Sequence, residues 1–441
     1  MSLAKNITSS YTSQIINILL GFISSVFIAR ILGAASRGEY ALYMNGLGVT
    51  TVFLGFGLPS AIIYFISSTK LKSEKLLTSL LVFNIAMTIV VALVLHILLI
   101  SDLQHFILPK DYQSKFYQFI FIFQFFITLL NSMLTAILNG RKHFVTLSII
   151  TVIITAISTI SYVLFYYKII NWGVDGFKMI ITLTLLLTFL QSILIIYFYH
   201  HFIGIRFSGL LKFKEFKTII TFSLIAYACN AIQFLSYRAD IWFVDYYSNI
   251  STVGIYALAV SLAQLMWILP NAIAGVLFSY IASCDREKAI DYTLFFTKLS
   301  FYATLLMALL ALTAFYFFLP VIYGLEFAGA VNLIGILFLG IVPFSIAIIF
   351  GSFFAGTGNI RHNLITTFLG FCGAIFFYII LIPKYGASGA AWASIISYNI
   401  CTIYMFFAFQ KISGHKIIKL FIINKSDLVL AKSVLIKMAR K

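Results

Sequence analysis

The sequence predicts an all-α membrane protein of about twelve transmembrane helices in two parallel six-helix lobes. Of its 441 residues, 62% are hydrophobic and only 10% are charged, which is too little charge for the surface of a soluble domain of this size. Uncharged stretches of membrane-spanning length recur along the chain, and short motifs recur in the same order in its two halves. The sequence lacks the short alternating segments of a strand barrel.

Twelve runs contain no Asp, Glu, Lys or Arg, and each can hold the roughly 20 apolar residues that a helix needs to cross about 30 Å of hydrocarbon. The first run is long and is followed by "RILG", so we interpret it as a spanning helix and not as a cleavable signal peptide. The runs are 6–29, 41–69, 76–101, 116–140, 144–167, 179–199, 218–237, 246–284, 299–325, 327–360, 363–383 and 385–410.

The basic residues predict which side of the membrane each end of the chain occupies. With the N-terminus inside, 22 of the 30 Lys and Arg residues fall in inner segments. The positive-inside rule therefore places both termini in the cytoplasm. The net charge of +17 reflects this topology and a rim that faces anionic lipid, and it does not indicate a nucleic-acid partner.

Four motif pairs, offset by 211 to 218 residues, indicate an internal duplication. "GEYAL" recurs as "GIYAL" and "WGVDGF" as "YGASGA", while Pro59 matches Pro270 and Gly140 matches Gly358. Because six crossings return the chain to its starting side, the halves are parallel repeats, as in transporters that bind substrate between two lobes. The predicted divisions are a lobe at 1–200, a cytoplasmic linker at 201–217, a second lobe at 218–410 and a basic amphipathic tail at 411–441.

A few charges stand close to the apolar runs, where a charge in hydrocarbon costs roughly 2.5–3.5 kcal/mol and usually faces a bundle interior or a wet cavity. Arg30 ends the first run, and Arg238 lies on the seventh, which is the first helix of the second half. If both face the cavity between the lobes, they form a cationic site. Arg37 falls in what we expect to be a loop, and Glu39 in the first turn of the second helix.

Structural roles are open alternatives for these side chains. Arg30 also fits a residue that snorkels to the outer interface, and Glu39 an acid that stabilises a helix start. On the seventh helix, Asp245 shares the face of Arg238, and Asp240 points nearly the opposite way. A structural intramembrane ion pair of Arg238 with Asp240 or with Asp245 is the alternative for these residues.

Phosphate is the ligand that the arginines favour. A guanidinium fork matches phosphate oxygens, and a diphosphate about 5 Å away at an effective dielectric constant of about 20 gains about 3 kcal/mol per unit charge pair. A lipid-linked sugar diphosphate is a plausible cargo, because its tail stays in lipid while its head needs a wet path. Neutral polar residues inside the runs are expected to form interhelical hydrogen bonds, and a subset to bind sugar hydroxyls. They are Asn17, Asn45, Asn84, Gln124, Asn131, Gln191, Asn230, Gln233, Gln264, Asn271 and Asn399.

Three stretches carry a family resemblance over nearly the whole chain up to about residue 410. "ARILGAASRGEYAL", "YRADIWFVDYYSNISTVGIYALAVSLAQLMWILPNAIAGVLFSYIA" and "IPKYGASGAAWASIISY" resemble the oligosaccharide flippases of surface-polysaccharide synthesis, in the multidrug/oligosaccharidyl-lipid/polysaccharide exporter (MOP) superfamily. The resemblance implies two lobes around a central cavity, as in multidrug exporters of that superfamily, and a cavity that is cationic in this branch. It implies translocation of undecaprenyl-diphosphate-linked repeat units across the bacterial cytoplasmic (inner) membrane, for O-antigen (lipopolysaccharide) or capsule synthesis.

The same resemblance implies alternating access without a cofactor, coupled to a gradient of H⁺ or Na⁺. The cationic-cavity role is carried onto Arg30, Arg37 and Arg238, with Asp240, Asp245 and Glu39 as charge partners or ion-coupling candidates. Implied partners are the lipid-linked oligosaccharide, membrane lipids and other polysaccharide-assembly membrane proteins.

Two other functions are open. A drug/cation antiporter of the same superfamily would want carboxylates in its first helix, and run 6–29 has none. A polysaccharide polymerase or glycosyltransferase would need a sizeable outer loop with catalytic residues, and the longest outer loop, 102–115, is short. The sequence therefore favours a transporter over an enzyme.

Overall fold

The computed structural model describes residues 3–67, 73–101, 107–109, 112, 114–170, 172–204, 210–281 and 284–414. The regular elements of these residues are all helical, as predicted. They form two compact units, unit 1 at Met1–Trp242 and unit 2 at Phe243–Lys441. The lobe boundaries read from the sequence stay predictions, and most of the amphipathic tail lies outside the described residues.

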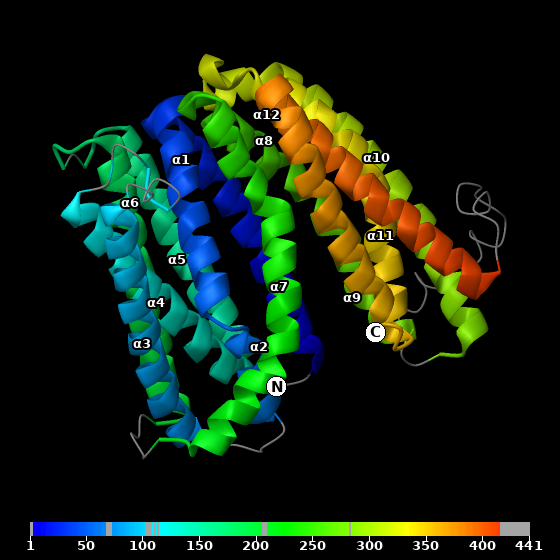
Figure 1. Ribbon diagram of the computed structural model, residues 1–441, viewed down its shortest axis with the longest axis horizontal. Helices are drawn as coiled ribbons and strands as arrows, with labels where there is room; N and C mark the ends of the chain where they lie inside the picture. Colours follow the sequence, from blue (N-terminus) through cyan, green and yellow to red (C-terminus); the bar gives the residue numbers. More distant parts are fainter. Residues whose placement is uncertain are drawn as a thin grey trace. The chain divides into compact units, whose positions relative to one another are not determined.

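Unit 1 holds the first six helices and most of the seventh. Its first helix is not continuous, because Gly33 has φ 69° and ψ 178°, and the ribbon turns back there (Figure 1). Both parts of this helix are therefore long enough to cross a membrane. The helices are α1 (Leu3–Leu54), α2 (Leu58–Ser67), α3 (Ser73–Ile100), α4 (Lys115–Gly140), α5 (Phe144–Tyr166), α6 (Gly176–Phe202) and α7 (Phe213–Tyr247).

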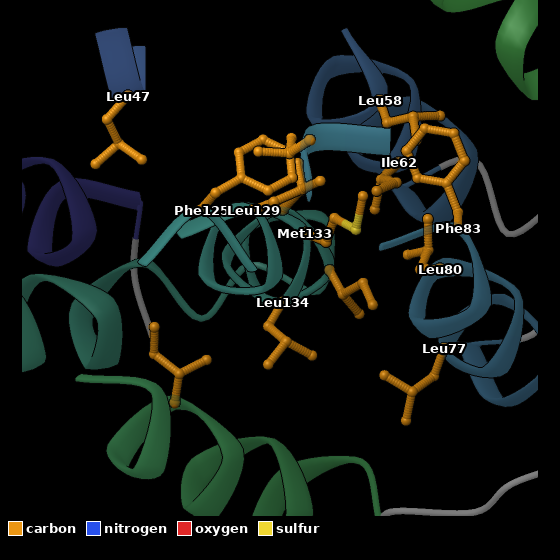
Figure 2. Packing of buried hydrophobic residues seen from close by; sticks show 14 of the residues in the cluster. Leu47, Leu58, Ile62, Leu77, Leu80, Phe83, Phe125, Leu129, Met133 and Leu134 are labelled. Atoms are coloured by element: carbon orange, nitrogen blue, oxygen red, sulfur yellow. The ribbon is translucent and has the colours of Figure 1, made fainter. Parts of the chain in front are cut away.

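Helix α4 lies at the centre of unit 1 and packs against α1, α2, α3, α5 and α6. One face of it carries Phe125, Leu129 and Met133, which point toward Leu58 and Ile62 of α2 (Figure 2). Burying each such side chain stabilises the unit by roughly 1.5–3 kcal/mol where the side chain would otherwise be in water. Where it would otherwise be in lipid, the stabilisation comes from van der Waals packing between the helices. This face of α4 packs against α2, and a neighbouring face of α4 lines a cavity that is described below.

Unit 2 has α11 at its centre, packed against α8, α9, α10 and α12. Helix α12 contains a break at Gly386, with φ 56° and ψ −133°, and so resembles α1 in being two helices joined at a glycine. The elements are α8 (Ile250–Gln264), η3 (Leu265–Trp267), α9 (Ile268–Ile281), α10 (Arg286–Tyr323), η4 (Leu325–Phe327), α11 (Ala330–Gly356) and α12 (Arg361–Ser413).

The helices are long and apolar enough for a multi-pass membrane protein. Nine helical segments of the described residues qualify as spans, and those containing Gly33 and Gly386 are 43 and 53 residues long. At 1.5 Å per residue, each of these two can cross twice. With the 35-residue α7, the described helices accommodate the twelve crossings that the sequence predicts.

The two central helices end in the same way, which supports the internal duplication. The N–H of Arg141, after α4, donates to the carbonyl of Ile137 at 3.0 Å, and the N–H of Thr357, after α11, donates to that of Phe353 at 2.9 Å. Both pairs of equivalent positions, Arg141 with Thr357 and Ile137 with Phe353, are 216 residues apart.

The glycines at these two helix ends also touch equivalent neighbours. A Cβ on Gly140 would lie 2.8 Å from the Ile66 side chain, and one on Gly356 would lie 2.7 Å from that of Ile281. The match of Gly140 to Gly358 is therefore wrong by two residues, and Gly356 is the equivalent glycine.

Candidate functional site

Arg30 lies on the first part of α1, three residues before the turn at Gly33, and its side chain is exposed. Its Nη1 donates a hydrogen bond of 3.1 Å to the Tyr166 hydroxyl at the end of α5, and its guanidinium carbon lies 5.9 Å from the centre of that ring. Arg30 is thus held against α5. Both a phosphate-binding role and an interfacial role remain compatible with this position.

Arg37 and Glu39 occupy a different environment from the one expected. The chain is helical on both sides of Gly33, so Arg37 lies in a helix and not in a loop, and Glu39 lies beyond the first turn. Both side chains are only 8% exposed. The physical reason is that a single glycine makes the turn, which leaves the charged segment inside the bundle and not at its rim. Buried charges of this kind are costly unless paired, and they mark functional candidates.

Arg238 lies half-buried on α7, beside the second part of α1. Its backbone carbonyl accepts a hydrogen bond of 3.3 Å from Asn45 Nδ2. Asp240 is buried, and its Oδ1 accepts a bond of 2.8 Å from the N–H of Ile241. Asp245 is half-buried near the end of α7, in unit 2. A shared phosphate between Arg30 and Arg238 stays a prediction, as do the charge-partner roles of the two aspartates.

A tyrosine–carboxylate cluster in unit 1 was missed from the sequence. The Tyr112 hydroxyl donates a bond of 3.3 Å to Asp175 Oδ2, and the same oxygen accepts one of 3.3 Å from the N–H of Lys178 at the start of α6. The pKa of Tyr112 is raised by burial first, then by the negative charges of Glu39 and Asp175. These residues fall in separate sequence segments, so only the folded chain brings them together.

Alkaline pH should destabilise the protein through Tyr112. Below about pH 10 the tyrosine is protonated in both folded and unfolded chains, and above it the unfolded chain loses the proton first. Because the folded chain then binds more protons, stability falls as pH rises from about 10 toward the raised folded pKa. We expect the melting temperature in detergent to fall less steeply from about pH 9 to about pH 11 in Tyr112→Phe than in wild type. Equal slopes would contradict this, and Tyr316→Phe, on an exposed position of α10, is the control.

Unit 1 contains two adjoining cavities, both open to their surroundings. The smaller, of about 160 Å³, is lined partly by Thr51, Gly57, Tyr227 and Asn230. The larger, of about 420 Å³, lies between α2, α4 and α6, and Pro59 and Ser132 line both. Among the described residues that line the larger cavity, none is charged. They are Pro59, Ile63, Thr128, Asn131, Ser132, Thr135, Ala136, Asn139, Thr188 and Gln191.

The structure separates the neutral polar residues that look alike in the sequence. Asn17 bonds Thr151 of α5, Asn84 bonds the Phe126 carbonyl of α4, and Gln124 accepts from the Tyr43 hydroxyl of α1, so these join helices as expected. Asn131 and Gln191 line the larger cavity. No sequence signal distinguishes the two groups, because each residue is simply an amide in an apolar run.

Comparison with known proteins defines the family. Residues 3–284, more than half of the chain, match the family of polysaccharide biosynthesis proteins. Among curated proteins, none matches the chain.

Solved structures share the fold at low sequence identity. An inward-facing multidrug resistance MATE family transporter of the MOP superfamily matches with a TM-score of 0.69 and 16% identity, over 92% of this chain and 98% of that one. The lipid II flippase MurJ, in an inward closed conformation, matches with a TM-score of 0.63 and 18% identity, over 96% of both chains. A MOP superfamily transporter from Pyrococcus furiosus matches with a TM-score of 0.61 and 17% identity, over 93% of this chain and 96% of that one. The chain is therefore a multi-pass membrane protein that belongs to the polysaccharide biosynthesis protein family and has the fold of MOP-superfamily transporters.

Proposed function

We propose that this protein is a flippase that moves undecaprenyl-diphosphate-linked oligosaccharide repeat units from the cytoplasmic to the outer leaflet of a bacterial cytoplasmic membrane. The observation that carries the proposal is the combination of a polysaccharide biosynthesis family match with a transporter fold, which is also the fold of a lipid II flippase. The repeat units that it moves would be built into an O-antigen or a capsule. Both termini would lie in the cytoplasm, as the basic residues favour.

The charge pattern supports an anionic cargo. The described part of α1 before Gly33 carries Arg30 and no carboxylate, whereas an exporter of cationic drugs would need negative charge facing its path. Arg37 and Arg238 add buried or half-buried positive charge on α1 and α7. Alternating access, coupled to H⁺ or Na⁺, would carry the diphosphate across while the lipid tail stays in hydrocarbon. Asp240, Asp245 and Glu39 are our candidates for the coupling groups.

Flux in proteoliposomes tests this proposal. The purified protein is reconstituted with a labelled undecaprenyl-diphosphate oligosaccharide from a host strain, and label appearing in the outer leaflet is followed with and without an H⁺ or Na⁺ gradient. We expect flux well above that of protein-free vesicles. Failure to move any lipid-linked sugar, together with export of an organic cation such as ethidium, would replace the flippase by an antiporter.

A further inference from the structure

We propose that the larger cavity of unit 1 is a separate subsite for uncharged sugar residues of the cargo, formed by one face of α4 with α2 and α6. This inference rests on the proposed flippase function and assigns the sugar its own binding surface, apart from the arginines. Seven of the ten lining residues carry a hydroxyl or an amide. Such groups, in a neutral pocket, match a polyhydroxylated ligand and not a phosphate or a cation.

The polar residues of α4 follow the helical period. Thr128, Ser132, Thr135 and Asn139 are spaced by four, three and four residues, which places them along one stripe. The packing stripe of Phe125, Leu129 and Met133 lies beside it and faces α2 and α3 (Figure 2). The polar stripe is thus a continuous surface, separate from the one that holds the unit together.

Unit 2 shows that the fold does not require this stripe. At the offset of 216 established by the ends of α4 and α11, all five polar positions of α4 that line the cavity become apolar or glycine. The equivalent helix is still the most buried centre of its unit. The substitutions are Thr128 to Phe344, Asn131 to Ala347, Ser132 to Ile348, Thr135 to Gly351 and Asn139 to Ala355. Apart from the Asn131 amide nitrogen, which bonds α6, the polar groups of α4 in this cavity are therefore not needed for helix packing.

Hydrogen bonding within the cavity is incomplete, which leaves an acceptor for a ligand. Asn131 is 7% exposed, and its Nδ2 donates a bond of 3.2 Å to the Thr188 carbonyl. Its Oδ1 is buried and has no partner among the described residues. A buried acceptor left in this way keeps the full cost of its desolvation, and a ligand donor that reached it after a small side-chain movement would recover that cost.

The hydroxyls beside Asn131 are also available to a ligand. Most threonines on the spanning helices bond back to their own helix, as Thr155 does to the Thr151 carbonyl at 2.8 Å. Within the described part of the chain, Thr128, Ser132 and Thr135 make no such bond. Their hydroxyls can therefore donate to and accept from a sugar without breaking an existing bond.

The volume of the cavity agrees with a sugar. About 420 Å³ lies in the range of roughly 300–1,000 Å³ typical of small-molecule sites. A single water occupies only about 30 Å³, so the space far exceeds what one solvent molecule or a bare cation needs. Water alone is the competing occupant of the cavity, and the experiments below distinguish it from a sugar.

Flux of two cargoes by isosteric variants tests the subsite. Thr128→Val/Thr135→Val removes two hydroxyls at constant shape, and Thr155→Val/Thr367→Val is the control because both of its hydroxyls are bonded to their own helices. The cargoes are undecaprenyl diphosphate with a full repeat unit and undecaprenyl diphosphate with one sugar. We expect the apparent KM of the first variant to rise about tenfold for the full repeat and less than about twofold for one sugar. If the wild type moves both lipids and the Thr128→Val/Thr135→Val variant keeps the wild-type KM values, the subsite is overturned and the flippase function stands. If the wild type moves neither lipid, both proposals are overturned.

Thiol labelling provides a readout that does not depend on flux. Ser132→Cys and its unit 2 equivalent, Ile348→Cys, are made in a background with all four native cysteines replaced by serine. A water-soluble methanethiosulfonate should label Ser132→Cys at least about tenfold faster than Ile348→Cys, because Ser132 lies among polar cavity residues, whereas the equivalent positions around Ile348 are apolar or glycine. Lipid carrying the full repeat should slow this labelling, and bare undecaprenyl diphosphate should not. Equal labelling of the two cysteines, or equal protection by the two lipids, would contradict a sugar subsite.

Discussion

Replacing Arg238 by alanine should lower the flux of undecaprenyl-diphosphate oligosaccharide by about 100-fold. One guanidinium about 5 Å from a diphosphate contributes about 3 kcal/mol at an effective dielectric constant of about 20, and about 1.4 kcal/mol corresponds to a factor of ten. Arg238 is half-buried, so solvent screens it less than it screens the exposed Arg30, and the bond from Asn45 uses its carbonyl and not its guanidinium. The measurement is the initial rate in proteoliposomes at matched protein content.

Arg30 should have a smaller effect, about tenfold, because it is exposed and its charge is better screened. Two further variants separate phosphate binding from anchoring. Tyr166→Phe removes the hydroxyl that Arg30 contacts and keeps the charge, and Arg30→Lys keeps the charge without the fork. If Tyr166→Phe lowers flux as much as Arg30→Ala does, Arg30 acts by holding α1 against α5. Full flux in both Arg30→Ala and Arg238→Ala would remove the arginines from the cargo site.

The sequence is informative about these charges because charge inside apolar runs is rare. Arg30 and Arg238 stand out for that reason alone. The environment of Arg37 and Glu39 was predicted wrongly, because a gap between two apolar runs is typical of a loop. The chain instead turns at one glycine and resumes its helix at once, so the segment stays buried. The length of a turn depends on a backbone dihedral that hydropathy does not report.

The fold could be predicted from the sequence more fully than the cavity could. Spanning runs and parallel repeats follow from composition and spacing, and the structure agrees with twelve crossings and equivalent central helices. The cavity was not predictable, because Thr and Ser are common on spanning helices and usually bond their own backbone. Whether Thr128 faces a helix or a space is decided by where α2 and α6 pack. Only the comparison of α4 with α11 shows that the polar stripe is unusual.

The second large effect is expected at Gly57, where the chain passes from α1 to α2. Gly57 has φ +63°, a region that costs an L side chain roughly 1–2 kcal/mol. A Cβ there would lie 3.0 Å from the Ser223 carbonyl oxygen and 3.0 Å from the Tyr227 nitrogen, both backbone atoms of α7. Overpacking against backbone adds roughly 1–3 kcal/mol. Gly57→Ala should therefore lose roughly 2–5 kcal/mol of stability, seen as a lower melting temperature in detergent and a smaller folded yield.

Two other glycines divide this loss into its parts. Gly173 has φ +62°, and no atom lies within 4 Å of the place that a Cβ would occupy, so Gly173→Ala reports backbone strain alone. Gly140 lies at the end of a helix, and its Cβ would meet the Ile66 side chain at 2.8 Å, so Gly140→Ala reports crowding without backbone strain, offset by up to about 1 kcal/mol of helix propensity that alanine gains. Because α7 backbone is less able to yield than an isoleucine side chain, the Gly57→Ala loss should exceed the sum of the other two. A melting temperature for Gly57→Ala equal to that of Gly173→Ala would mean that α7 moves aside at no cost, and that its approach to Gly57 does not fix the seventh helix within unit 1.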